Sequence, residues 1–266
     1  KKVGYYTASK VSQNILWKIK NKLSLNHLAK NSTLLVLIFG LSLTLRLAHF
    51  IDMKRNNPIA DLPIVDSAEY VKIDEYILDK NLFGPPTSSY WHPPLYYYFV
   101  AIIFNLSGRS LDAIRLLQII LDSLNALMVF FVARIIFNKT IAVISALLYS
   151  IYLPFVYYSA EILPPILMTT LVLLSTLFLL KFTQEIKKNK KLNIRWLIFA
   201  SVSFGLLIIT QPTFALAFIL IAIWLFIVVH QRPILIRLQC MILFIIISLV
   251  PTALVTARNY FVSREP

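Results

Sequence analysis

The sequence predicts an all-α integral membrane protein with about seven transmembrane helices and a long first external loop that carries short interfacial or re-entrant helices. Hydrophobic residues make up 58% of the chain and charged residues only 14%. A soluble domain carries about a quarter charged residues and cannot bury this much apolar surface. Apolar runs long enough to cross a bilayer recur along the chain, which favours several spans. The single cysteine, Cys240, leaves no disulfide framework or cysteine metal site.

The formal net charge of +14 comes from basic residues that cluster beside apolar segments. This is the positive-inside pattern of membrane proteins, so it indicates contact with membrane lipid and no nucleic-acid partner. Residues 1–30 contain seven lysines and no acid, which predicts a basic arm on the cytoplasmic surface. We expect a transmembrane domain over 31–261, with an external loop over 51–111, and a tail over 262–266.

Seven segments are predicted to cross the membrane: 31–50, 116–136, 141–158, 162–182, 196–210, 213–229 and 238–255. The lysine-rich stretch 187–191 and Lys139 belong on the cytoplasmic side. Working back from these positions places the N-terminus inside, and it places Arg115 and Glu161 outside.

The segment 93–110 is predicted not to cross, because both of its ends are external in this topology. Its apolar part, 95–106, is about 18 Å long as a helix, against a hydrocarbon core of about 30 Å. We expect a half-buried or re-entrant helix surrounded by protein. The preceding stretch 70–82 has the pattern of a short amphipathic helix that lies along the interface.

Charged residues are expected at the ends of the spans. Arg46 lies near the far end of the first span, where it can snorkel or pair with an acid of the next loop. No charge is expected at the middle of a span. A transporter or channel needs polar groups through its depth, so this pattern disfavours a conduit.

Candidate functional residues gather on the predicted external face: Asp66, Glu69, His92, Arg115, Glu161, Gln211 and Arg258. Acids and cations together suit a reaction that removes a proton from an acceptor and handles an anionic phosphate. Asp66 is the candidate general base, since a carboxylate half-shielded from water takes up a proton more readily. His92, Arg115 and Arg258 would hold phosphate. Glu161 would be a second acid that orients a cation or the acceptor, and Glu69 is a further catalytic candidate.

Each candidate also has a structural interpretation. Asp66 and Glu69 suit a solvated loop, and His92 before two prolines suits a helix start. Glu161 and Arg115 suit a structural ion pair. Arg258 suits a membrane boundary.

The sequence requires no metal or cofactor. It contains no His-x-x-x-His motif, no cysteine pair and no glycine-rich phosphate loop. Asp66, Glu69 and Glu161 could share a divalent cation through oxygen, but their spacing does not demand one.

Short motifs follow one another in a recognisable order. They are Leu-Arg46-Leu, Val-Asp66-Ser-x-Glu-Tyr70, His92-Pro-Pro-Leu-Tyr96, Ala113-Ile-Arg115-Leu, Phe137-Asn-Lys139, Tyr158-Ser-Ala-Glu161, Thr210-Gln-Pro212 and Ala257-Arg258-Asn259-Tyr260. In this order and spacing the chain, over about residues 34–261, resembles the membrane glycosyltransferases of the GT-C superfamily. It is similar in particular to the bacterial branch of protein O-mannosyltransferases and the lipid A aminoarabinose transferase.

The resemblance implies a sugar donor on a polyprenyl phosphate and transfer on the external face, which for this branch is that of the bacterial inner membrane. It implies that Asp66 activates the acceptor, that His92 handles the donor, and that Glu161 is the second acidic position. Arg115 and Arg258 match basic positions near the donor phosphate.

The chain also departs from this family. It stops soon after Tyr260, whereas relatives commonly have more spans and an external C-terminal domain, so it resembles an N-terminal half. Gln211 stands beside Pro212 where a basic residue is expected. These departures favour an alternative hypothesis, a non-catalytic scaffold or accessory subunit that works with other membrane subunits or a separate C-terminal half. A transporter or channel is the third hypothesis.

Overall fold

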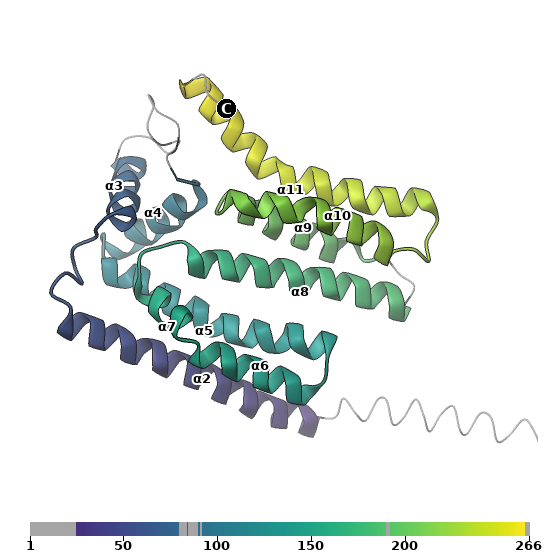
Figure 1. Ribbon diagram of the computed structural model, residues 1–266, viewed down its shortest axis with the longest axis horizontal. Coiled ribbons are helices and arrows are strands. Elements are labelled where there is room, and N and C mark those ends of the chain that lie inside the picture. The colour runs from purple at the N-terminus through teal and green to yellow at the C-terminus, as the bar shows by residue number, and fades with distance from the viewer. Residues whose placement is uncertain (1–24, 80–83, 85–89, 91, 190–191, 264–266) are drawn as a thin grey trace, which may run out of the picture.

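A computed structural model of the protein describes residues 25–79, 84, 90, 92–189 and 192–263. Every regular element within these ranges is a helix, which confirms the predicted all-α class (Figure 1). The expected basic arm lies largely outside the described residues, as does most of the expected tail.

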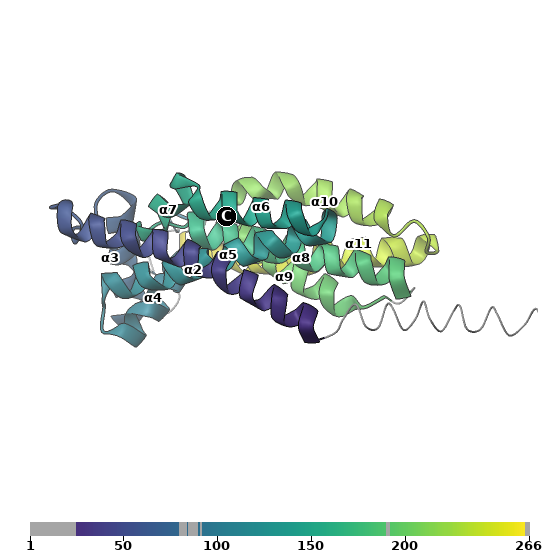
Figure 2. The ribbon, with the colours of Figure 1, turned by 90° about the horizontal axis from the view of Figure 1, so that it is seen from below.

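Seven helices lie side by side and alternate in direction along the chain (Figure 1): α2 (Leu25–Asn56), α5 (Leu111–Ile136), α6 (Lys139–Ile151), α8 (Pro165–Asn189), α9 (Ile194–Ile208), α10 (Ala215–Val228) and α11 (Ile234–Ser263). Four further helices complete the described fold: α3 (Asp66–Asp79), α4 (Leu95–Ser107), α7 (Leu153–Ala160) and η1 (Pro212–Phe214). Both views place α3 and α4 at one end of the bundle, where α2 ends and α5 begins (Figures 1 and 2). We call this end the α3–α4 end.

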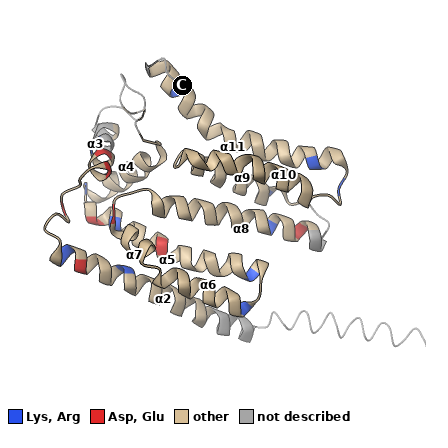
Figure 3. Cartoon of the chain, viewed as in Figure 1, with Lys and Arg blue, Asp and Glu red and all other residues tan. Residues whose placement is uncertain are grey.

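The lengths of the apolar helices show an integral membrane protein. Within the described residues, α2, α5, α8 and α11 contain apolar stretches long enough to cross a membrane, and α6 with α7 forms a fifth candidate that bends by 51°. The helices α9 and α10 are apolar but shorter. The coarse expectation of a polytopic helical protein is therefore confirmed, and the count of seven spans stays a prediction. Charged residues concentrate at the two ends of the bundle (Figure 3).

The helix α4 is short because its boundaries are fixed by residues that stop helices. It begins after Pro93 and Pro94, and it ends at Gly108, which has a left-handed φ of 65°. Its 13 residues span about 20 Å, which is less than the bilayer core. It packs against α3 through a buried aromatic and aliphatic cluster that includes Tyr70, Ile77 and Tyr97.

The helix predicted over 70–82 is observed as α3, which begins four residues earlier than expected, and its position along the interface stays a prediction. Asp66 and Glu69 lie in its first turn, where the positive end of the helix dipole favours carboxylates. The loop position expected for Asp66 is therefore corrected to the first residue of a helix.

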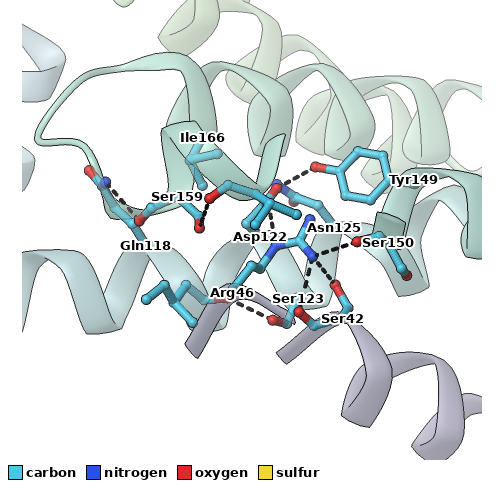
Figure 4. A network of polar contacts seen from close by, with 12 residues as sticks. Ser42, Arg46, Gln118, Asp122, Ser123, Asn125, Tyr149, Ser150, Ser159 and Ile166 are labelled. Carbon is cyan, nitrogen blue, oxygen red and sulfur yellow. Dashed lines mark hydrogen bonds and ion pairs between the residues drawn. The ribbon is translucent and has the colours of Figure 1, made fainter. Parts of the chain in front are cut away.

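Two expectations about charge inside the bundle were wrong. Arg46 neither snorkels nor pairs with a loop acid: its Nε lies 2.5 Å from Oδ2 of Asp122, near the middle of α5, and both side chains are fully buried (Figure 4). Asp122 is thus a charge inside a span. The sequence does not show which helices are neighbours, so the pairing of Arg46 with Asp122 could not be predicted. It does show that Gln118, Asp122 and Asn125 share one face of α5, because they are spaced by four and three residues.

Between α2, α5 and α6, the buried polar groups around Arg46 and Asp122 give way to apolar side chains. Deeper between α2, α5 and α6 lies an apolar cluster that includes Ile38, Ala126, Phe130 and Ala142. This apolar layer disfavours a conduit between these helices, although a charged pair does lie within the bundle.

The second half of the bundle packs through small residues. A methyl group added at Gly205 of α9 would lie 2.6 Å from the carbonyl oxygen of Ser248 in α11. The Ser248 hydroxyl donates to the Ser201 carbonyl at 3.1 Å. Close approach of backbones is how helices associate in membranes, where burial from water contributes little.

The variant Gly205→Ala should lower the midpoint of thermal unfolding in detergent, because overpacking a tight contact costs about 1–3 kcal/mol. The matched control is Gly40→Ala, also within a helix, where an added methyl group meets no atom within 4 Å. Equal unfolding midpoints for the two variants would show that α9 and α11 are not tightly packed.

Candidate active site

Asp66 opens α3 directly after a strained residue. Val65 has a φ of 52°, a left-handed conformation that is unusual for a β-branched side chain. Its carbonyl accepts from the backbone N–H groups of Ala68 and Glu69, at 3.2 and 3.4 Å. Such strain persists where the surrounding structure holds it, often at functional sites. Here it turns the chain so that Asp66 begins the helix.

The Asp66 carboxylate lies against His92. Oδ1 of Asp66 is 3.8 Å from Nε2 of His92, and the Asp66 side chain is 57% exposed. The predicted base is therefore open to solvent on one side and held by a potential cation on the other. The structure brings these two predicted site residues together, although Asp66 begins α3 and His92 lies in the segment before α4.

An aromatic ring packs against His92 beside this contact. The Tyr70 ring lies 5.3 Å from His92 and 4.7 Å from Tyr96, centre to centre. Burial, with smaller contributions from Asp66 and Glu69, raises the pKa of Tyr70 to about 12. The Tyr70 hydroxyl thus stays protonated near neutral pH and does not compete with Asp66 as a base.

A hollow of about 140 Å³ is lined by Ser67, the residue after Asp66, and we call it the Glu161 hollow. Its walls come from the end of α2, the following loop, α3, α5 and α7, and include Met53, Asn57, Ser67, Arg115, Tyr157 and Glu161. Arg115 and Glu161, both predicted site residues, therefore share one hollow.

Arg115 forms hydrogen bonds and ion pairs with other groups of the protein. It is buried, its Nε donates to the Ala160 carbonyl at 3.1 Å, and its Nη2 donates to the Ala60 carbonyl. Its Nη1 lies 3.1 Å from Asp112 and 3.5 Å from Asp61. The hydrogen bond from Lys54 and the nearby charge of Arg115 lower the pKa of Asp61. Arg115 thus holds the loop between α2 and α3, which leads to Asp66, against α5.

Gln118 is a buried site residue that the sequence analysis missed. Its side-chain amide donates to the Glu161 carbonyl at 2.5 Å, and its oxygen accepts from the Tyr96 hydroxyl. It therefore joins the Glu161 hollow to α4, the helix that follows His92. The available signal was its place about one turn after Arg115, on the face of α5 that also carries Asp122 and Asn125.

A second hollow, of about 270 Å³, lies on the His92 side, and we call it the His92 groove. It is lined by Tyr90, His92, Pro212, Thr252, Thr256 and Asn259, among others. Thr252 and Thr256 also line an adjoining apolar hollow of about 580 Å³ along α11, with Leu249, Ala253, Tyr260 and Phe261. The groove thus has mixed polar and apolar walls, and it adjoins a hollow whose walls are mainly apolar.

Arg258 lies beside the His92 groove. Its guanidinium carbon is 4.1 Å from the centre of the Tyr90 ring, and its Nη1 donates to Oδ1 of Asn259 at 3.1 Å. The predicted residues therefore do not line a single cavity: Arg115 and Glu161 line the Glu161 hollow, His92 lines the His92 groove with Arg258 beside it, and Asp66 lines neither. Among the described residues, no group of three His, Cys, Asp or Glu side chains is placed to hold a metal ion.

The helices and these hollows define a polytopic membrane protein whose polar site lies at one end of its bundle. The sequence profile of the family described as dolichyl-phosphate-mannose-protein mannosyltransferase matches residues 91–256, more than half of the chain. The chain therefore belongs to this family of GT-C-type glycosyltransferases. The match includes His92, Arg115 and Glu161, and it begins after Asp66. No curated protein sequence matches the chain.

The variant Arg115→Met should lower the midpoint of thermal unfolding, because it leaves buried carbonyls without donors at about 1–3 kcal/mol each. Arg134→Met, at the exposed far end of the same helix, is the matched control and should change little. If both variants unfold like the parent, Arg115 does not fasten the loop, and its predicted role as a phosphate ligand is favoured instead.

Proposed function

We propose that this protein transfers a glycosyl group from a polyprenyl-phosphate donor to an acceptor at the α3–α4 end of the bundle. The position of Asp66 carries the proposal. Its carboxylate contacts His92, which lines the groove, and the next residue, Ser67, lines the Glu161 hollow. A base between two hollows can meet an acceptor from one side and a donor from the other.

The donor suits the His92 groove. An isoprenoid chain needs an apolar surface, which the hollow along α11 supplies. The phosphate needs cations at the polar end of that surface, where His92 and Arg258 lie. The family's description names mannose on dolichyl phosphate, so polyprenyl-phosphate mannose is the first donor to test.

In the proposed reaction the acceptor lies in the Glu161 hollow and loses its proton to Asp66. The acceptor oxygen attacks the anomeric carbon opposite the phosphate, so the configuration inverts as the bond to the phosphate oxygen breaks. His92 and Arg258 stabilise the charge on the departing polyprenyl phosphate. Glu161 and Glu69 would orient the acceptor, and Arg115 would hold the loop.

The proposal includes the predicted topology. The N-terminus is cytoplasmic, the short helices α9 and α10 cross to complete seven spans, and the site faces outward from a bacterial inner membrane. The basic stretch after α8 then lies inside, as the positive-inside rule requires.

The variant Asp66→Asn should abolish release of polyprenyl phosphate from polyprenyl-phosphate mannose, followed by mass spectrometry on protein in detergent. Loss of a general base lowers rates by about 10²–10⁴-fold. Asp52→Asn is the matched control: Asp52 is an exposed acid near the same end of the bundle, and its variant should keep the parent rate.

Full turnover by Asp66→Asn would refute its role as the base. If the parent neither binds nor turns over any polyprenyl-phosphate sugar, the transferase proposal fails for this chain. A non-catalytic subunit would then be the better account.

A further inference from the structure

The span formed by α6 and α7 is broken inside the bundle. The two helices differ in direction by 51°, and Tyr152 between them has an extended backbone with ψ 109°. Pro154 lies in the first turn of α7. In a continuous helix, the Ser150 carbonyl would accept from the N–H of residue 154, but proline has none. The sequence therefore leaves one carbonyl without its helical donor.

Arg46 supplies that donor from α2. Its Nη1 donates to the Ser150 carbonyl at 3.2 Å, and also to Oγ of Ser42 at 2.7 Å (Figure 4). Ser150 is fully buried. An unpaired carbonyl in such a place costs several kcal/mol in a membrane, so this contact stabilises the break.

The charge of Arg46 is neutralised in the same place. Asp122 of α5 pairs with its Nε, and the Tyr149 hydroxyl donates to Asp122. Tyr149 and Ser150 are consecutive residues in the last turn of α6. The Arg46–Asp122 pair, which joins α2 to α5, therefore also binds the last turn of α6, immediately before the break.

The residues after the break form a wall of the Glu161 hollow. Tyr157 of α7 and Glu161 at its end both line the hollow. The far end of α7 is held from α5, because Gln118 and Arg115 donate to the carbonyls of Glu161 and Ala160. The direction in which α7 leaves α6 sets where this wall begins.

We propose that Arg46 is a positioning residue for the candidate active site. By donating to the carbonyl that Pro154 leaves unpaired, it holds the break between α6 and α7 and so sets the position of α7 and its Tyr157 and Glu161. This inference concerns the geometry of the hollow, and it is independent of the chemistry proposed for it.

Spin-label distances test this directly, with Cys240→Ala as the background. One pair joins Tyr158→Cys on α7 to Leu254→Cys on α11, and a control pair joins Leu148→Cys on α6 to the same α11 site. All three labelled positions are exposed hydrophobic residues. Arg46→Lys keeps a positive charge opposite Asp122 but loses the planar guanidinium that donates to Asp122, Ser42 and the Ser150 carbonyl together.

We expect Arg46→Lys to shift or broaden the distances from α7 and to leave those from α6 unchanged. Pro154→Ala restores a backbone donor for Ser150, so Arg46→Lys should then cause no further shift. The effects of the two substitutions on the α7 distance should therefore not add. If Arg46 only stabilised the fold in general, the two substitutions would act independently.

An unchanged α7 distance in Arg46→Lys would overturn the proposal, and so would equal shifts in the Pro154 and Pro154→Ala backgrounds. A shift of the α6 pair as large as that of the α7 pair would also overturn it, because the whole bundle would then have moved. Arg46→Lys alone decides the question if a Pro154→Ala variant does not fold.

Discussion

The bundle is organised around a charged pair placed where charges are most costly. Arg46 and Asp122 are fully buried between helices that cross the membrane, and each charge is tolerable only because the other neutralises it. Ser42 and the Ser150 carbonyl accept from Nη1 of Arg46, and Tyr149 and Asn125 donate to Asp122, whereas Nη2 of Arg46 is buried without a hydrogen-bond partner. Three elements, α2, α5 and α6, are therefore fixed relative to one another by one cluster.

The candidate active site extends this arrangement towards the α3–α4 end. Along one face of α5, Asp122, Gln118 and Arg115 reach successively closer to that end. Gln118 and Arg115 donate hydrogen bonds to backbone carbonyls at the end of α7. Arg115 also donates to a carbonyl of the loop before Asp66. Side chains from rigid spans thus position the walls of the Glu161 hollow, whereas Asp66 keeps an exposed carboxylate that can meet substrate.

Composition and charge pattern were sufficient to predict an all-helical membrane protein, the short apolar helix α4 and the gathering of Asp66, His92, Arg115 and Glu161 near one end. Those features depend on hydropathy, helix length and order along the chain. The partner of Arg46 and the role of Gln118 could not be predicted, because both depend on which helices are neighbours. The division of the candidate site into two separate hollows could not be predicted from the sequence either, because it depends on how α3 and α11 pack around His92.

The central claim is that the Arg46–Asp122 pair is one energetic unit on which the bundle depends. A double-mutant cycle measures it most directly, with thermal unfolding in detergent of Arg46→Met, Asp122→Leu and the double variant. Each single variant leaves a buried charge unpaired and should lose about 3–5 kcal/mol, whereas the double variant should lose much less than the sum. Additive losses would contradict the claim, because the two residues would then contribute independently.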